Sequence, residues 1–225
     1  MRITRLRTNH IDKPLGFDLA HVLLSWTVED CNGHWQTASQ IQVACGSTEI
    51  LVFDSGRCET VHDESTGQII SGMDNLGWEL PFPLNPRTRY FWRVAAWTDT
   101  GESAWSDWTW FETAKAADEP WMGRMIASSL GPDVHPIFFH TFRVLKPVCS
   151  ARLYCYGLGV YEAYLNHEKV GDEVLMPGLH AYDSYLQYQT LELMPVQGEN
   201  TIAFAMGDGW FKGRYGLKAS SFRYG

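Results

Sequence analysis

Alternation between apolar and polar residues runs through the first half of the chain, as expected for strands that bury one face. The first run covers residues 22–28, and its apolar face consists of Val22, Leu24, Trp26 and Val28. Residues 40–43 repeat the pattern, and a third run places on one face Tyr90, Trp92, Val94 and Ala96. Because a proline-bearing turn precedes Tyr90, its hydroxyl can hydrogen-bond back across the corner. The spacing of these runs predicts a seven-stranded β-sandwich over residues 1–115.

A second alternating region follows a polar linker at residues 116–121. Strands are predicted at residues 137–144, 151–164, 185–193 and 201–206. In the second of these, alternation gathers small residues on one face, namely Cys155, Gly157, Gly159 and Ala163. A hairpin turn is expected at residues 166–169, because Asn166 tolerates a left-handed backbone, and a further turn at residues 198–200. The last strand directs inward Ile202, Phe204 and Met206. Residues 122–225 are therefore predicted to form a second β-sandwich, which makes the whole chain all-β.

Two segments of the first region resemble known domains. Residues 83–108, PLNPRTRYFWRVAAWTDTGESAWSDW, are similar to a fibronectin type III or immunoglobulin-like domain. Within them, Trp105-Ser106-Asp107-Trp108 resembles the tryptophan-serine box of cytokine receptors, in which an arginine stacks between tryptophans. Arg93, on the neighbouring strand, is the residue placed to do so. Cytokine recognition is not expected, because the paired disulfides typical of extracellular receptors are missing from the sequence.

A more specific resemblance lies in three segments of the second region. Residues 157–178 read GLGVYEAYLNHEKVGDEVLMPG, a GEN turn precedes the last apolar strand, and residues 207–216 read GDGWFKGRYG. Together they resemble the N-terminal β-sandwich module of bacterial family 78 glycoside hydrolases, the α-L-rhamnosidases. The resemblance implies a jelly-roll, galactose-binding-like sandwich that is truncated at residue 225, because the family module continues with further strands.

Composition and charge narrow the choice of partners. The chain has 225 residues, and 26 acidic residues outnumber 18 basic ones, for a net charge of −8. Such a balance argues against nucleic acid as a partner, and no apolar stretch is long enough to span a membrane. Five cysteines without a C-x-x-C pair suggest neither a disulfide framework nor a zinc site, so a reducing, cytoplasmic location is expected.

Candidate binding residues lie in two loops of the second domain. The glycines between residues 207 and 213 are expected to let the chain leave the sheet sharply, so that Trp210 covers its rim. Carbohydrate contacts are predicted for six side chains: Asp208, Trp210, Lys212, Arg214, His180 and Tyr182. The alternative is structural, with Asp208 bonding turn amides and Arg214 pairing with an acidic neighbour. No metal or other cofactor is expected. The resemblance implies calcium for some family members, but the sequence lacks carboxylates at calcium-loop spacing.

Catalysis is not expected of this chain. Glycosidases place two carboxylates across the scissile bond, and the acidic residues here are scattered. The resemblance implies that the catalytic carboxylates belong to a downstream (α/α)6 domain, so the chain should be an inactive N-terminal fragment of an α-L-rhamnosidase. A stand-alone interaction or adhesion module is the alternative. If the second sandwich is incomplete, its exposed sheet edges are expected to pair in a homodimer.

Overall fold

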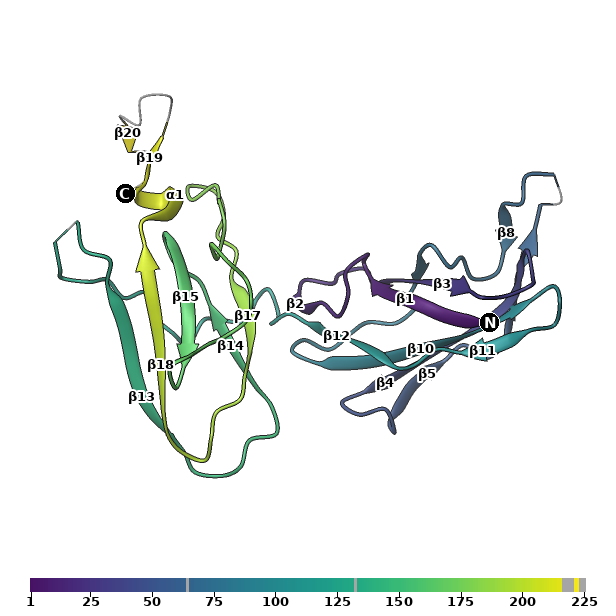
Figure 1. Ribbon diagram of the computed structural model, residues 1–225, viewed down its shortest axis with the longest axis horizontal. Helices are drawn as coiled ribbons and strands as arrows, with labels where there is room; N and C mark the ends of the chain where they lie inside the picture. The colour runs from purple at the N-terminus through teal and green to yellow at the C-terminus, as the bar shows by residue number, and fades with distance from the viewer. Residues whose placement is uncertain (64, 132, 216–220, 223–225) are drawn as a thin grey trace. The chain divides into compact units, whose positions relative to one another are not determined.

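A computed structural model describes the chain at residues 1–63, 65–131, 133–215 and 221–222, and describes residues 214, 215, 221 and 222 by their backbone alone. The chain divides into two compact units, unit 1 from Met1 to Glu119 and unit 2 from Pro120 to Gly225 (Figure 1). Nearly all of the regular secondary structure in both units is β-strand, which confirms the all-β prediction.

The described part of unit 1 contains two larger sheets and a separate two-stranded hairpin. The smaller one is ordered β1 (Arg2–Thr8), β3 (Leu23–Glu29), β9 (Trp78–Glu79). The larger one is ordered β2 (Leu15–Phe17), β12 (Thr109–Thr113), β10 (Arg89–Thr98), β4 (Gln36–Cys45), β5 (Leu51–Asp54). Two further short strands join it, β11 (Ser103–Trp105) on β10 and β6 (Cys58–Glu59) on β4. A separate hairpin pairs β7 (Val61–His62) with β8 (Ile69–Ser71). The described part of unit 1 therefore has twelve strands where seven were predicted: six have four or more residues, and six have two or three.

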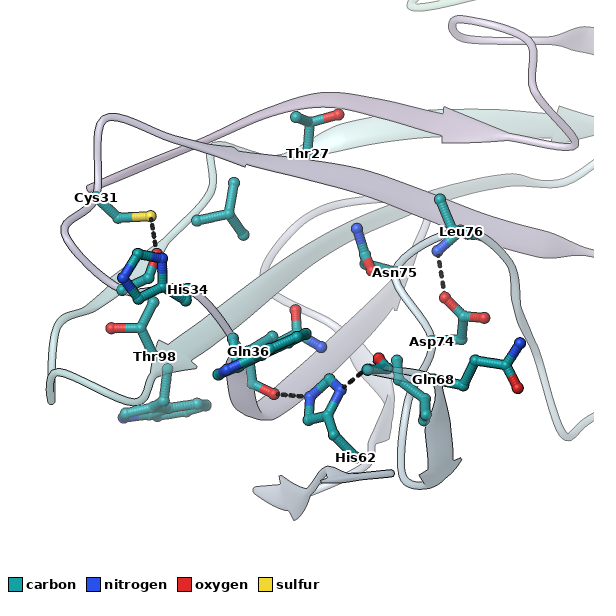
Figure 2. Close-up of a pocket in the computed structure, with 16 residues that line it drawn as sticks. Thr27, Cys31, His34, Gln36, His62, Gln68, Asp74, Asn75, Leu76 and Thr98 are labelled. Atoms are coloured by element: carbon teal, nitrogen blue, oxygen red, sulfur yellow. Dashed lines mark hydrogen bonds between the residues drawn. The ribbon is translucent and has the colours of Figure 1, made fainter. Parts of the chain in front are cut away.

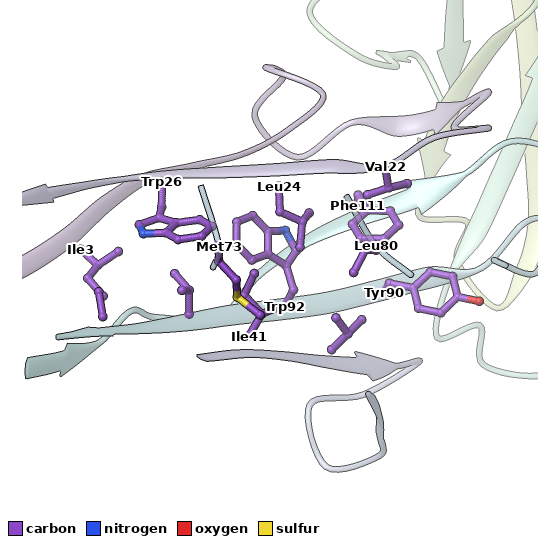
Figure 3. Close-up of a cluster of buried hydrophobic side chains, with 13 residues drawn as sticks. Ile3, Val22, Leu24, Trp26, Ile41, Met73, Leu80, Tyr90, Trp92 and Phe111 are labelled. Carbon is purple, nitrogen blue, oxygen red and sulfur yellow. The ribbon is translucent and has the colours of Figure 1, made fainter. Parts of the chain in front are cut away.

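The core of unit 1 lies between these sheets and uses the faces that alternation predicts (Figure 3). Its buried residues include Val22, Leu24, Trp26, Ile41, Val43, Tyr90, Trp92, Val94 and Ala96. The corner before β10 is closed as expected, because the backbone N–H of Asn85 donates to the Tyr90 hydroxyl at 2.9 Å. Burial raises the pKa of that phenol, so the hydroxyl stays protonated.

A ladder of cations and indoles covers the outer face of the larger sheet. The Arg93 guanidinium lies 4.5 Å from the ring centroid of Trp105 and 4.7 Å from that of Trp108. Its Nε donates to Gln42 Oε1 at 2.9 Å, which fixes the guanidinium plane between the two rings. The predicted stacking of Arg93 is thus confirmed, and it stabilises the strand-to-strand packing on this face.

Unit 2 is a sandwich of two sheets. One is ordered β13 (Ile137–Val144), β18 (Gly198–Gly207), β15 (Val160–Leu165), β16 (Glu168–Lys169), and the other pairs β14 (Ala151–Cys155) with β17 (Gln189–Leu193). After β18 come one helical turn, α1 (Gly209–Lys212), and the pair β19 (Arg214–Tyr215) and β20 (Ser221–Phe222). The core includes Tyr161, Ala163, Leu165, Leu191 and Leu193, with the predicted Ile202, Phe204 and Met206 packed against it.

Three strand boundaries of unit 2 differ from the prediction. The run 151–164 breaks into β14 and β15, which belong to different sheets, because Gly159 has a φ of +114° and turns the chain between them. The strand predicted at 185–193 begins only at Gln189. Residues 198–200 already belong to β18, so the turn lies just before them. The hairpin at residues 166–169 is confirmed, with Asn166 at φ 51° and His167 at φ 76° between β15 and β16.

Candidate functional site

A cavity of about 610 Å³ in unit 2 adjoins the end of β18, and we call it the β18 pocket. Three parts of the unit line it: residues of the segments 121–131 and 134–138, the connection between β14 and β15, and the turn from β18 into α1. Its polar groups include His135, Asp208 and Lys212, and its aromatic rings include Trp121 and Tyr156. The two rings meet edge to face with centroids 5.1 Å apart, so they form a fixed aromatic wall.

Glycines bring the backbone segments around this pocket into contact. The chain leaves β18 at Gly207 and enters α1 at Gly209, whose φ is +52°. A Cβ on Gly209 would lie 2.7 Å from Val160 N, and one on Gly159 would lie 2.4 Å from Gly207 O. The sharp exit predicted for this segment is therefore found. It requires glycine on both sides, because the start of β15 and the start of α1 touch through their backbones.

We expect Gly159→Ala to lower the free energy of unfolding of unit 2 by about 2 kcal/mol, since alanine disfavours the positive φ and its methyl overlaps a backbone oxygen. Thermal unfolding followed by circular dichroism measures this loss. Gly123→Ala is the matched control, because nothing lies within 4 Å of the Cβ it would add. Equal melting temperatures for the two variants would contradict the close approach seen here.

Asp208 presents its carboxylate to the pocket. It occupies the N-cap position of α1 but makes no side-chain cap hydrogen bond, and its side chain is 44% exposed. Its Oδ1 lies 3.7 Å from Lys212 Nζ and 3.9 Å from His135 Nδ1. The bond to turn amides, which is the structural alternative for Asp208, is not seen among the described residues. The carboxylate instead faces two donors at distances that leave it able to accept further hydrogen bonds.

The six predicted binding residues do not form one site. Asp208 and Lys212 line the β18 pocket, whereas His180 and Tyr182 lie outside its lining. Trp210 is half-buried in α1 and does not line the pocket either, and the side chain of Arg214 lies outside the described residues. Tyr182 still contacts the same turn, because its ring meets that of Phe211 edge to face at 5.3 Å. Trp121, His135 and Tyr156 were not predicted as site residues. The sequence of residues 121–136 shows no alternation and no motif, so nothing in it marked Trp121 or His135.

His180 is a packed loop residue. It is 4% exposed, and its ring lies 5.7 Å from the ring of Tyr182 and 6.0 Å from that of Tyr185. Neither ring nitrogen has a hydrogen-bond partner among the described residues. His180 is therefore packed among the rings of its own loop and lies outside the lining of the β18 pocket.

The floor of the β18 pocket is not nucleophilic. Cys155 Sγ lies 3.5 Å from the Tyr161 hydroxyl, which in turn donates to Gln189 Oε1. Burial raises the pKa of the Cys155 thiol and also the pKa of the Tyr161 phenol. Both groups therefore stay protonated near neutral pH, where a thiol is a weak nucleophile.

In the described part of the chain, no cluster of three or more His, Cys, Asp or Glu side chains could hold a metal ion. Likewise, none of the helices formed by the described residues has the length and apolar character needed to cross a membrane.

Comparison with protein families gives two matches that follow each other along the chain. Residues 3–117 match the family described as "Rha78A-like, N-terminal immunoglobulin domain". Residues 146–225 match "Alpha-L-rhamnosidase N-terminal domain".

Individual relatives agree with these matches. An α-L-rhamnosidase of Formosa agariphila is 27% identical over 237 residues, which cover 90% of this chain and 24% of the relative. One of Streptomyces avermitilis is 35% identical over 133 residues, covering 57% of this chain and 12% of the relative. The chain thus spans a quarter or less of the length of these relatives.

Two solved structures are similar over nearly the whole chain. The α-L-rhamnosidase from Dictyoglumus thermophilum has a TM-score of 0.73 and 26% identity, covering 100% of this chain and 26% of that one. The enzyme from Aspergillus terreus has a TM-score of 0.80 and 28% identity, covering 97% of this chain and 25% of that one.

Proposed function

The chain belongs to the family defined by the Rha78A-like N-terminal immunoglobulin domain, here followed by an α-L-rhamnosidase N-terminal domain, and from this we propose that it is the non-catalytic N-terminal region of an α-L-rhamnosidase. One observation carries the proposal. Both domain families match in order and together account for nearly all of unit 1 and most of unit 2, within relatives about four times as long. In such an enzyme, hydrolysis of terminal L-rhamnose would belong to the part of the protein beyond this region.

The lining of the β18 pocket supports a role in binding rather than hydrolysis. Glycosidases place a pair of carboxylates about 5 to 10 Å apart across the scissile bond. Among the described residues that line the pocket, Asp208 is the single carboxylate. This arrangement offers an acceptor without an acid partner, so the chain should bind a sugar without cleaving it.

We also propose that the β18 pocket contacts carbohydrate. The carboxylate of Asp208 can accept hydrogen bonds from neighbouring hydroxyls, and His135 adds a donor or acceptor 3.9 Å away. Trp121 and Tyr156 supply apolar rings on which the C–H face of a deoxy sugar can pack. A rhamnose ring, with hydroxyls on one part and a methyl group on another, matches this division of the lining.

The test uses the whole 225-residue chain with methyl α-L-rhamnoside, followed by two-dimensional NMR. We expect saturable shifts of signals from residues 205–212, and about fivefold weaker binding for Asp208→Asn, the effect of one charge-assisted hydrogen bond. Asp172→Asn, an exposed carboxylate of unit 2 outside the pocket, should bind as the natural sequence does.

Hydrolysis is assayed in parallel with an aryl α-L-rhamnoside. Release of the aryl group at the buffer rate is expected, and turnover that disappears on changing one carboxylate of this chain would refute the non-catalytic assignment. Unchanged affinity in Asp208→Asn would refute the sugar contact at the β18 pocket alone.

A further inference from the structure

A second cavity, of about 680 Å³, lies in unit 1 beside the β7–β8 hairpin, and we call it the hairpin pocket (Figure 2). Its walls come from distant parts of the sequence: the end of β3, the start of β4, the hairpin, the loop at residues 74–76 and the end of β10. Cys31 and His34 lie toward one end, Asp74 and Gln68 toward the other, and His62 lies between them. The family matches assign no ligand to this cavity.

An indole is held in place at the hairpin pocket. Trp35 lines the cavity and remains 49% exposed, although one part of its ring is packed. A Cβ on Gly67, whose φ is +72°, would lie 2.8 Å from two carbons of that ring, so only glycine leaves room for the indole there. The His62 ring lies 5.3 Å from the indole. An exposed aromatic ring that is fixed in advance loses little conformational entropy when a ligand stacks on it.

His62 itself is positioned by the backbone. Its Nε2 lies 2.8 Å from Gln36 O and its Nδ1 lies 3.3 Å from Gly67 O. The contact with Gln36 ties the β7–β8 hairpin to the start of β4, and Trp35 is the residue just before that strand. The orientation of the indole therefore depends on the hairpin and not on a flexible loop alone.

Other residues that line the hairpin pocket carry hydrogen-bonding groups with unused capacity. The side-chain amide of Gln68 and the hydroxyl of Thr27 make no hydrogen bond to the described protein. Asp74 uses Oδ1 to accept from Leu76 N at 2.8 Å, which leaves its Oδ2 available. Asn75 donates through Nδ2 to Trp26 O at 3.2 Å, which leaves its Oδ1 as an acceptor. The pocket that holds this apolar ring is thus also lined by both hydrogen-bond donors and acceptors.

This combination defines a class of ligand. A sugar ring has C–H groups that pack on an indole and hydroxyls that both donate and accept, and planar amides and carboxylates suit pairs of such hydroxyls. Among the described lining residues, none is lysine or arginine and one, Asp74, is a carboxylate, so an anionic ligand would lack a counter-charge. We propose that the hairpin pocket binds a neutral sugar ring, stacked on Trp35 and hydrogen-bonded by Gln68 and Asp74. The proposal does not depend on the sugar contact at the β18 pocket.

NMR of the full chain tests the proposal with L-rhamnose, D-galactose and D-glucose, and with adenosine as a flat aromatic probe. We expect at least one sugar to shift the Trp35 indole N–H and Gln68 side-chain amide signals saturably. Gln68→Ala should weaken binding about fivefold, as expected for loss of one or two hydrogen bonds. Trp35→Ala should abolish saturation, whereas Asp208→Asn should leave these shifts unchanged.

The positions of the shifted signals distinguish binding at the hairpin pocket from binding at the β18 pocket. Shifts confined to residues 205–212 would overturn the hairpin-pocket proposal and leave the β18 pocket standing, and the reverse pattern would do the opposite. Adenosine binding in preference to all three sugars would also overturn it. If Trp35→Ala disturbs the hairpin fold, Gln68→Ala still decides, because the Gln68 side chain makes no hydrogen bond to the described part of the chain.

Discussion

Trp92→Ala should lower the free energy of unfolding of unit 1 by about 4 kcal/mol, the largest effect expected in this chain. The Trp92 side chain is fully buried between the two sheets of unit 1 (Figure 3). Its indole N–H donates to Thr8 Oγ1 at 3.2 Å, and Thr8 is itself 1% exposed. The substitution therefore removes a large apolar volume and also leaves a buried hydroxyl without that donor.

Urea unfolding measures the effect, with circular dichroism and tryptophan fluorescence fitted to separate transitions for the two units. Trp105→Ala is the matched control. Trp105 is 41% exposed and stacks on Arg93, so its loss should cost about 1 kcal/mol. Similar losses for the two variants would mean that the core of unit 1 is not packed around Trp92.

The interior of unit 1 could be predicted because each inner strand buries one face against the other sheet. Alternation in β3 and β10 places Leu24 and Trp92 inward, and both are fully buried. The ladder at Arg93 was also predictable, since the tryptophans of one short segment mark the face that the arginine must share. Strands such as β2 and β9, with three and two residues, were not, because two or three positions are too few to show a period.

The break between β14 and β15 shows a different limit. Local alternation is continuous through Gly157 and Gly159, but the chain turns there because Gly207, about fifty positions later, lies against Gly159. A contact so distant in sequence leaves no trace in the pattern of either segment. The one sequence feature that agrees with this contact is that both segments carry a glycine where they meet, Gly159 and Gly207.

The candidate sites were predictable only where neighbours in sequence are neighbours in space. Asp208 and Lys212 are four residues apart in one helical turn, and both line the β18 pocket. His135 reaches Asp208 because β13 pairs with β18, a register that joins Ile137 to Ala205. The hairpin pocket was missed because Trp35, Gln68 and Asp74 belong to three separate segments, and no one of them carries a motif.

Asn200→Ala should lower the free energy of unfolding of unit 2 by about 3 kcal/mol. Asn200 is 1% exposed and uses its side-chain amide fully. Its Oδ1 accepts from Val196 N and from Asn166 Nδ2, both at 2.9 Å. Its Nδ2 donates to Val196 O at 2.7 Å and to Gly198 O at 3.1 Å. Alanine would leave these partly buried backbone groups without their partner, which costs more than the hydrogen bonds themselves contribute.

The effect should extend to the β15–β16 hairpin, because Asn166 accepts from Thr201 N through its own Oδ1. Asn200 therefore joins two turns at one end of β18, while Asp208 follows its other end. Amide hydrogen exchange of the whole chain measures this coupling: Asn200→Ala should speed exchange throughout β15 and β18 and leave unit 1 unchanged. Glu199→Ala, an exposed neighbour, is the control. Exchange that accelerates only at residues 196–200 would show that the turn is held independently of the sheet.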